Sequence, residues 1–119
     1  MQRHLRLRRK EDFARLRQQG RVWQHPLLIL SVTSNGLAHN RYGFVTSKRV
    51  GTAVVRNRIR RLLREAVREV HAHLRQGYDI VFVARPRIVG QPFQEVRQAV
   101  SVSLQRAGLY HPPAEGASS

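Results

Sequence analysis

The sequence of 119 residues contains no cysteine and only seven acidic residues. The absence of cysteine excludes a disulfide framework, a thiolate zinc site and a cysteine nucleophile. The scarcity of carboxylates disfavours a nuclease site with two metal ions, because such a site needs clustered acidic ligands. The two aspartates, Asp12 and Asp79, are far apart in the sequence. We expect Asp12 to support the start of a helix and Asp79 to lie at the end of a strand.

Signals for membrane insertion and for protein-based catalysis are also missing. No apolar run approaches the roughly 20 residues that a membrane span requires. The N-terminal stretch MQRHLRLRRKEDF lacks the apolar core of a signal peptide. His71 and His73 face different sides of a helix, unlike a zinc-binding pair, and no glycine-rich phosphate loop is present. We therefore predict a cytoplasmic protein with no membrane association, no metal site and no catalytic residues of its own.

Positive charge dominates the composition. The 22 lysines and arginines against 7 acidic residues give a formal net charge of +15 with neutral histidines. Such self-repulsion opposes a compact fold unless a polyanion or counterions relieve it. The hydrophobic content of 41% and the regular apolar patterns distinguish the chain from a disordered basic arm. The composition therefore predicts a folded domain whose first candidate partner is nucleic acid.

The apolar patterns predict a chain of the α/β type, as an α+β two-layer sandwich with about three helices on a mixed, roughly four-stranded sheet. The predicted order is α-β-β-β-α-β-α, with residues 10–19, 21–24, 27–33, 41–47, 55–74, 78–84 and 93–107 as the elements. The third strand is expected to return from the second through the turn at Asn35 and Gly36. Because a helix separates the third strand from the fourth, these two should be parallel. Residues 1–110 are predicted as one domain and 111–119 as a flexible tail.

The central helix carries the strongest functional signal. Its aliphatic residues fill one arc, and a basic stripe lies on the opposite side. Guanidinium groups bind phosphate in bidentate geometry and keep their charge, while Glu65 and Glu69 stand at the edge of the stripe and leave its middle positive. A merely solvated helix face is the alternative interpretation, but it does not explain the displaced acids. The stripe comprises Asn57, Arg60, Arg61, Arg64 and Arg68, with Lys48 and Arg49 just upstream.

The segment VGTAVVRNRIRRLLRE, residues 50–65, resembles the Arg-Asn-Arg signature region of the bacterial ribonuclease P protein component. KEDFARLRQQG, RYGFVTSKRVG and YDIVFVARP resemble other segments of that family in the same order, so the resemblance covers residues from about 5 to 110. It implies a small protein subunit that binds a large catalytic RNA. The complex removes the 5′ leader of precursor tRNA, with the RNA as catalyst. Magnesium is then expected in the RNA–protein holoenzyme, and no cofactor on the protein.

The resemblance assigns residues to two RNA-binding surfaces. The surface for the catalytic RNA comprises Lys48, Arg49, Arg56, Asn57, Arg58, Arg60, Arg61 and Arg64, to which helix geometry adds Arg68. A sheet cleft is implied to receive the leader as a single strand, and Phe13 matches one aromatic residue of that cleft. Arg17 and Leu30 stand where some relatives have further aromatics, so we include both in the cleft and expect charge to take a larger share than stacking.

Other structural expectations accompany the resemblance. A core position is the alternative for Phe13, and the core is the expected place of four other aromatic residues, Tyr42, Phe44, Tyr78 and Phe82. The family implies a left-handed crossover between the parallel strands, although about 98% of such connections are right-handed. Oligomerisation of the protein is not predicted.

Two other functions fit parts of the same pattern. A structural RNA-binding protein of ribosomal type shares the small size and the high charge, and the same α/β topology is open to it. A DNA-binding protein could place the basic stripe in a major groove, but the chain lacks a convincing helix-turn-helix and commits the apolar side of that helix to a sheet. Reconstitution of leader cleavage with catalytic RNA separates the first alternative from the main prediction, and competition between duplex DNA and structured RNA separates the second.

Overall fold

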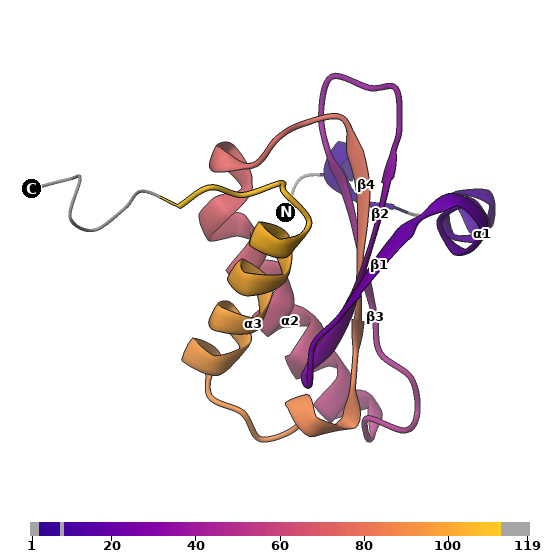
Figure 1. The fold of residues 1–119 in the computed structure, drawn as a ribbon. Coiled ribbons are helices and arrows are strands. Elements are labelled where there is room, and N and C mark those ends of the chain that lie inside the picture. The colour runs from indigo at the N-terminus through magenta and orange to yellow at the C-terminus, as the bar shows by residue number, and fades with distance from the viewer. Residues whose placement is uncertain (1–2, 8, 113–119) are drawn as a thin grey trace, which may run out of the picture.

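The computed structural model describes residues 3–7 and 9–112 and contains a four-stranded sheet with helices on both faces (Figure 1). Helices α2 (Ala53–Val70) and α3 (Phe93–Arg106) cover one face, and α1 (Lys10–Gln19) crosses the other. The strands are β1 (Arg21–Gln24), β2 (Leu28–Ser34), β3 (Arg41–Val45) and β4 (Tyr78–Ala84). Short 3-10 turns occur at Arg3–Leu5, His71–His73 and Pro86–Ile88. The predicted class and order of elements are confirmed.

The strands are arranged in the order β1-β2-β4-β3. β2 pairs antiparallel with β1 and β4, and β3 pairs parallel with β4, as the intervening helix predicted. β3 returns from β2 after the turn but does not pair with it, because β4 lies between them. β4 is buried along almost its whole length. A strand with apolar contacts on both faces belongs in the middle of a sheet, where both of its edges are also paired.

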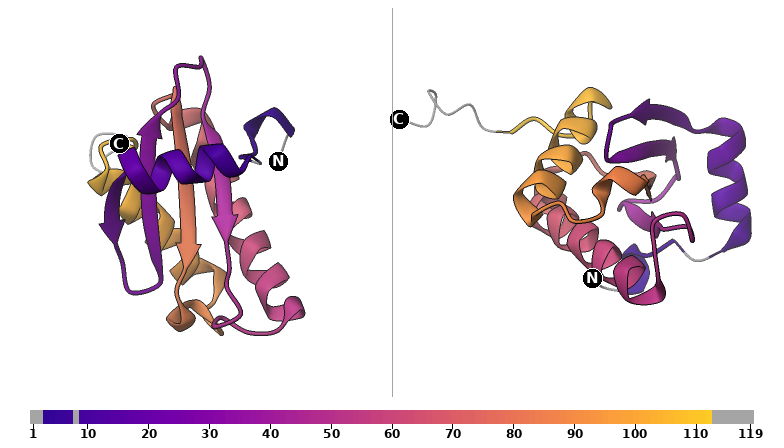
Figure 2. Two further views of the ribbon diagram at one scale, coloured as in Figure 1. Left: turned by 90° about the vertical axis from the view of Figure 1, so that its right-hand side faces the viewer. Right: turned by 90° about the horizontal axis from the view of Figure 1, so that it is seen from below.

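The connection from β3 through α2 to β4 is left-handed. In the left-hand view of Figure 2, β3 and β4 both point downward, β4 lies to the left of β3, and α2 lies behind the sheet. This hand opposes the general preference for right-handed crossovers and agrees with the expectation implied by the family.

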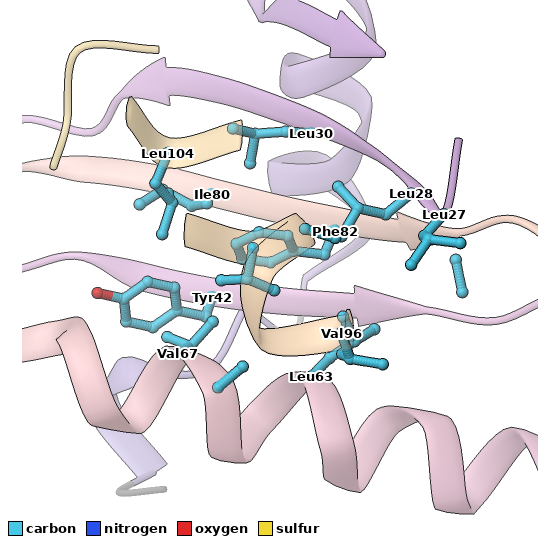
Figure 3. Close-up of a cluster of buried hydrophobic side chains, with 14 of the residues drawn as sticks. Leu27, Leu28, Leu30, Tyr42, Leu63, Val67, Ile80, Phe82, Val96 and Leu104 are labelled. Atoms are coloured by element: carbon cyan, nitrogen blue, oxygen red, sulfur yellow. The ribbon is translucent and has the colours of Figure 1, made fainter. Parts of the chain in front are cut away.

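The main core lies between the sheet and the two helices α2 and α3 (Figure 3). Leu30, Leu63 and Phe82 have no exposed surface. The ring of Phe44 stacks on that of Phe82, with 5.9 Å between the ring centroids. Tyr42 is buried and Tyr78 is partly buried against the same cluster, so the four aromatic residues predicted for the core are all found there.

The helix boundaries differ slightly from the predicted ones. α2 begins at Ala53 because the Thr52 side chain accepts a hydrogen bond from the backbone N–H of Val55, which caps the helix. At the other end the α-helix stops at Val70 and tightens into a 3-10 turn. The predicted tail spans residues 111–119. Its part beyond Pro112 lies outside the described residues. Within the described ranges, no helix is long and apolar enough to cross a membrane.

Truncation of Leu63 tests the assignment of the two sides of α2. Leu63→Ala leaves a cavity in a packed core, so the free energy of unfolding should fall by about 2–5 kcal/mol in urea denaturation. Val54 lies on the same helix but is 79% exposed, and Val54→Ala should change that free energy by less than about 0.5 kcal/mol. Equal losses for the two variants contradict the assignment.

Candidate nucleic-acid interface

The basic stripe of α2 lies opposite the side that packs on the sheet. Ile59, Leu63 and Val67 are buried against the core. The arginines fall into two groups by exposure. Arg58, Arg61 and Arg68 are exposed, and Arg56, Arg60 and Arg64 are half-buried. The predicted division of the helix into an apolar and a basic side is confirmed.

Two of the half-buried arginines contact the end of strand β3 and the residue that follows it. Arg60 donates hydrogen bonds to the Thr46 hydroxyl and to the side-chain oxygen of Asn57. The Arg64 guanidinium lies over the Phe44 ring, 5.7 Å from its centroid, a favourable cation–π geometry. Contacts of this kind fix the guanidinium groups before a ligand arrives, which lowers the entropy cost of binding.

The N-terminal segment adds a further basic residue to this edge. The backbone N–H of Leu7 donates to the carbonyl of Tyr42 at 2.8 Å, and Leu5 and Leu7 are both buried, so residues 5–7 run along the outer edge of β3. Burial, followed by the positive charges of Arg6 and Arg60, lowers the pKa of Arg64. Arg6 was not predicted as a site residue. Its position in a basic N-terminal run between two leucines, both of which are buried, was the available signal.

The acidic residues of α2 lie along the other edge of the stripe. Glu65 pairs with Arg68 at 3.6 Å, and Glu69 pairs at 3.2 Å with Arg97 of α3. Among the described residues, no acidic side chain pairs with Arg60, Arg61 or Arg64. The positive charge in the middle of the stripe is therefore not neutralised within this part of the chain. Lys48 and Arg49, both exposed, lie in the turn before α2.

A second surface lies on the face of the sheet that α1 crosses, beside the helix. We call it the open sheet face. Strand alternation turns toward it the side chains of Val22, Gln24, Ile29, Ser31, Val45 and Val83. Val22 is 55% exposed and Val45 is 36% exposed. Apolar side chains at this level of exposure can contact the bases of an unpaired strand.

Phe13 of α1 lies at the border of the open sheet face. It is half-buried beside Leu16 and Val81. Its ring sits directly on Gly43, where a Cβ atom would be only 3.0 Å from two ring carbons. Phe13 thus combines a packing contact with a partly accessible ring. Arg17 is exposed and lies one turn further along the same side of α1.

Leu30 is not part of the open sheet face. Its side chain has no exposed surface and belongs to the main core, on the opposite side of the sheet from α1 (Figure 3). The assignment of Leu30 to the leader cleft is therefore wrong. Because successive residues of a strand alternate between faces, its neighbours Ile29 and Ser31 lie on the open sheet face instead.

Further basic residues lie where β4 ends. Arg85 and Arg87 line a hollow of about 320 Å³ together with Gln24, His25 and Pro26. The Arg85 guanidinium donates to the carbonyl of His25 at 3.3 Å. Burial, followed by the charge of Arg106, lowers the pKa of His25. The two arginines were not predicted as site residues, although their place after a buried strand was visible in the sequence.

Asp79 is a buried charge that sequence reasoning did not find. It lies near the start of β4, at a strand end as expected, but has no exposed surface and binds two arginines. Asp12, in the first turn of α1 as expected, joins the same cluster through Arg41. Among residues 3–7 and 9–112 no group of three or more histidine or acidic side chains could hold a metal ion.

Comparisons with known proteins agree with this arrangement. A family model described as Ribonuclease P matches residues 1–108. The ribonuclease P protein component of Herpetosiphon aurantiacus is 46% identical over 111 residues, which cover 93% of this chain and 90% of that protein. The corresponding protein of Chloroflexus aurantiacus is 46% identical over 114 residues, which cover 95% and 84%.

Solved structures show the same fold. The RNase P protein of Staphylococcus aureus aligns with a TM-score of 0.84 and 25% identity, covering 90% of this chain and 98% of that one. That of Thermotoga maritima aligns with a TM-score of 0.79 and 28% identity, covering 85% and 96%. Family, sequence and fold therefore agree: the chain belongs to the ribonuclease P protein family and is a subunit of this ribonucleoprotein endoribonuclease.

Proposed function

We propose that the protein binds the catalytic RNA of ribonuclease P through the basic stripe of α2 and the 5′ leader of precursor tRNA through the open sheet face. The observation that supports this most directly is the position of strand β3. Arg64 packs over Phe44 of β3 and Arg60 binds Thr46 just after it, while Val45 of the same strand belongs to the open sheet face. The two surfaces therefore meet at one strand, so the protein can contact both RNAs close to each other.

The stripe acts as a phosphate-binding surface. Guanidinium groups bind phosphate oxygens in bidentate geometry, and neutralising phosphates releases counterions. The catalytic RNA and the precursor repel each other as polyanions, and a protein of net charge +15 between them weakens that repulsion. The divalent ions for hydrolysis, which we expect to be magnesium, are held by RNA phosphates, because the described chain offers no suitable ligand group. The proposed location is the cytoplasm.

The open sheet face distinguishes the substrate from the product. An unpaired leader can stack on Phe13 and contact Ile29 and Val45, and such contacts depend little on base sequence. Arg17 and Arg85 are placed to contact its phosphates. Mature tRNA lacks the leader and cannot make these contacts, so the interaction favours precursor over product.

Leader removal at limiting magnesium tests the overall function. Adding the protein to catalytic RNA should lower the magnesium concentration needed for half-maximal cleavage of precursor tRNA, because protein cations replace part of the ionic screening. Cleavage assays with and without protein, across a magnesium titration, measure this. Identical titration curves would count against a role in this reaction.

Removing two stripe arginines tests the surface for the catalytic RNA. Arg60→Ala with Arg64→Ala should weaken RNA binding and reduce the slope of log K against log salt by about 1.5, since two phosphate contacts are lost. Arg75→Ala with Arg97→Ala removes the same charge from exposed positions outside the stripe. This control should leave the slope almost unchanged. Equal slopes for the two double variants contradict the assignment.

Truncation of Phe13 tests the leader surface. Phe13→Ala should weaken holoenzyme binding of precursor tRNA by about 1–3 kcal/mol, the contribution typical of one stacked base, with little effect on mature tRNA. Phe93→Ala removes another half-buried ring, at the start of α3 and away from the open sheet face, and serves as the control. If Phe13→Ala weakens binding of both RNAs to the same extent, Phe13 is not a leader contact.

A further inference from the structure

We propose that Asp79 is a positioning residue for leader recognition: its buried carboxylate holds Arg15, and thereby fixes α1 where Phe13 and Arg17 border the open sheet face. This inference rests on the proposed function of that face. It assigns a role to a charged cluster that touches neither RNA-binding surface directly, and it predicts coupling between Arg15 and leader binding.

Asp79 is the centre of a hydrogen-bonded cluster. Arg41 of β3 binds it in bidentate geometry, with Nε 2.8 Å from one carboxylate oxygen and Nη2 2.8 Å from the other. The side-chain amide of Asn35 donates to Oδ1 at 3.0 Å, and Arg15 of α1 donates to Oδ2. The hydrogen bond to Asp79 is the largest cause of the raised pKa of Arg41, and it outweighs the effect of burial. The carboxylate thus joins α1 and β3 to its own strand, β4.

Asp12 completes the cluster from the helix side. Its carboxylate lies 3.2 Å from Arg41 and 3.9 Å from Arg15. Two carboxylates therefore face two guanidinium groups, and the cluster has no net charge. α1 contributes two of its members, Asp12 and Arg15, and Phe13 stands between them in the sequence. Asp12 and Arg15 are three positions apart and lie on one side of α1, next to the position of Phe13, so the cluster holds the helix close to the aromatic ring.

Apolar packing alone gives α1 only a small attachment to the sheet. The apolar cluster between α1 and the sheet has Leu7, Leu16 and Val81 as its buried members, with Phe13 and Val83 partly buried. The main core on the other face is much larger. A buried ion pair contributes little net stability, because desolvation offsets the Coulomb attraction, but in some proteins it specifies one arrangement of its partners. Here that arrangement is the placement of α1.

Arg15→Met provides the sharpest test, because it removes the tether while keeping an unbranched side chain at a residue that is 31% exposed. In the reconstituted holoenzyme, the affinity ratio between precursor and mature tRNA should fall on the order of threefold to tenfold. Binding of the catalytic RNA and its salt dependence should not change. Hydrogen exchange should become faster in α1 and stay constant in α2. Arg15→Lys, which keeps one charged donor, should restore part of the ratio.

A double-mutant cycle separates positioning from a direct contact. If Arg15 acts through Phe13, the variant Arg15→Met with Phe13→Ala should have nearly the same affinity ratio as Phe13→Ala alone. Arg97→Met is the matched control, because Arg97 also pairs with an acidic residue, Glu69, but lies on α3. It should leave the ratio unchanged.

The outcomes distinguish the two levels of the proposal. If Phe13→Ala lowers the affinity ratio but Arg15→Met leaves it intact, or if the two effects add fully, the positioning role of Asp79 is overturned. If Phe13→Ala itself does not lower the ratio, the proposed leader site fails, whatever Arg15→Met does. Faster exchange in α1 together with non-additive losses supports the positioning role.

Discussion

Mutual repulsion among 22 basic side chains is the constraint under which this small fold forms. The protein meets it by separating charge from core within single elements. Helix α2 shows this most clearly, because one arc closes the core while the other carries arginines. Several of these arginines have local partners, such as the Phe44 ring for Arg64 and the Thr46 hydroxyl for Arg60. Positive charge that the fold does not neutralise attracts RNA, which is a polyanion.

The two faces of the sheet differ in how much of them is covered. On one face a large apolar cluster supports α2, and the buried Phe82 and Leu63 belong to it. On the other face only α1 is attached, through a small apolar contact and the Asp79 cluster. The rest of this face is left to Val22, Val45 and their neighbours. The leader site that we propose depends on this arrangement, in which α1 is attached at one place and leaves the rest of the face open.

The sequence predicted those features that local periodicity determines. The helical spacing of α2 was long enough to define its buried and basic sides, and the compact apolar run of β4 marked a buried strand. Apart from the parallel orientation of β3 and β4, features that depend on pairing between distant residues were not predicted. The face of the sheet on which Leu30 lies depends on which side of β2 packs toward α2. A shift of one residue in the strand register moves the side chain to the other face. The insertion of β4 between β2 and β3, and the burial of Asp79 beside Arg15 and Arg41, depend on tertiary contacts across more than thirty residues. The left-handed crossover came from family resemblance and opposes the general rule.

The lack of cysteine permits a direct test of the central claim that two RNAs occupy two surfaces. Single cysteines at Arg61 on the stripe, at Ser31 on the open sheet face and at Gln98 on α3 can each carry a tethered hydroxyl-radical source in the reconstituted holoenzyme with bound precursor tRNA. We predict strand breaks in the catalytic RNA from position 61, in the 5′ leader from position 31, and few in either from position 98. Breaks in the leader from position 61 and none from position 31 would contradict the account.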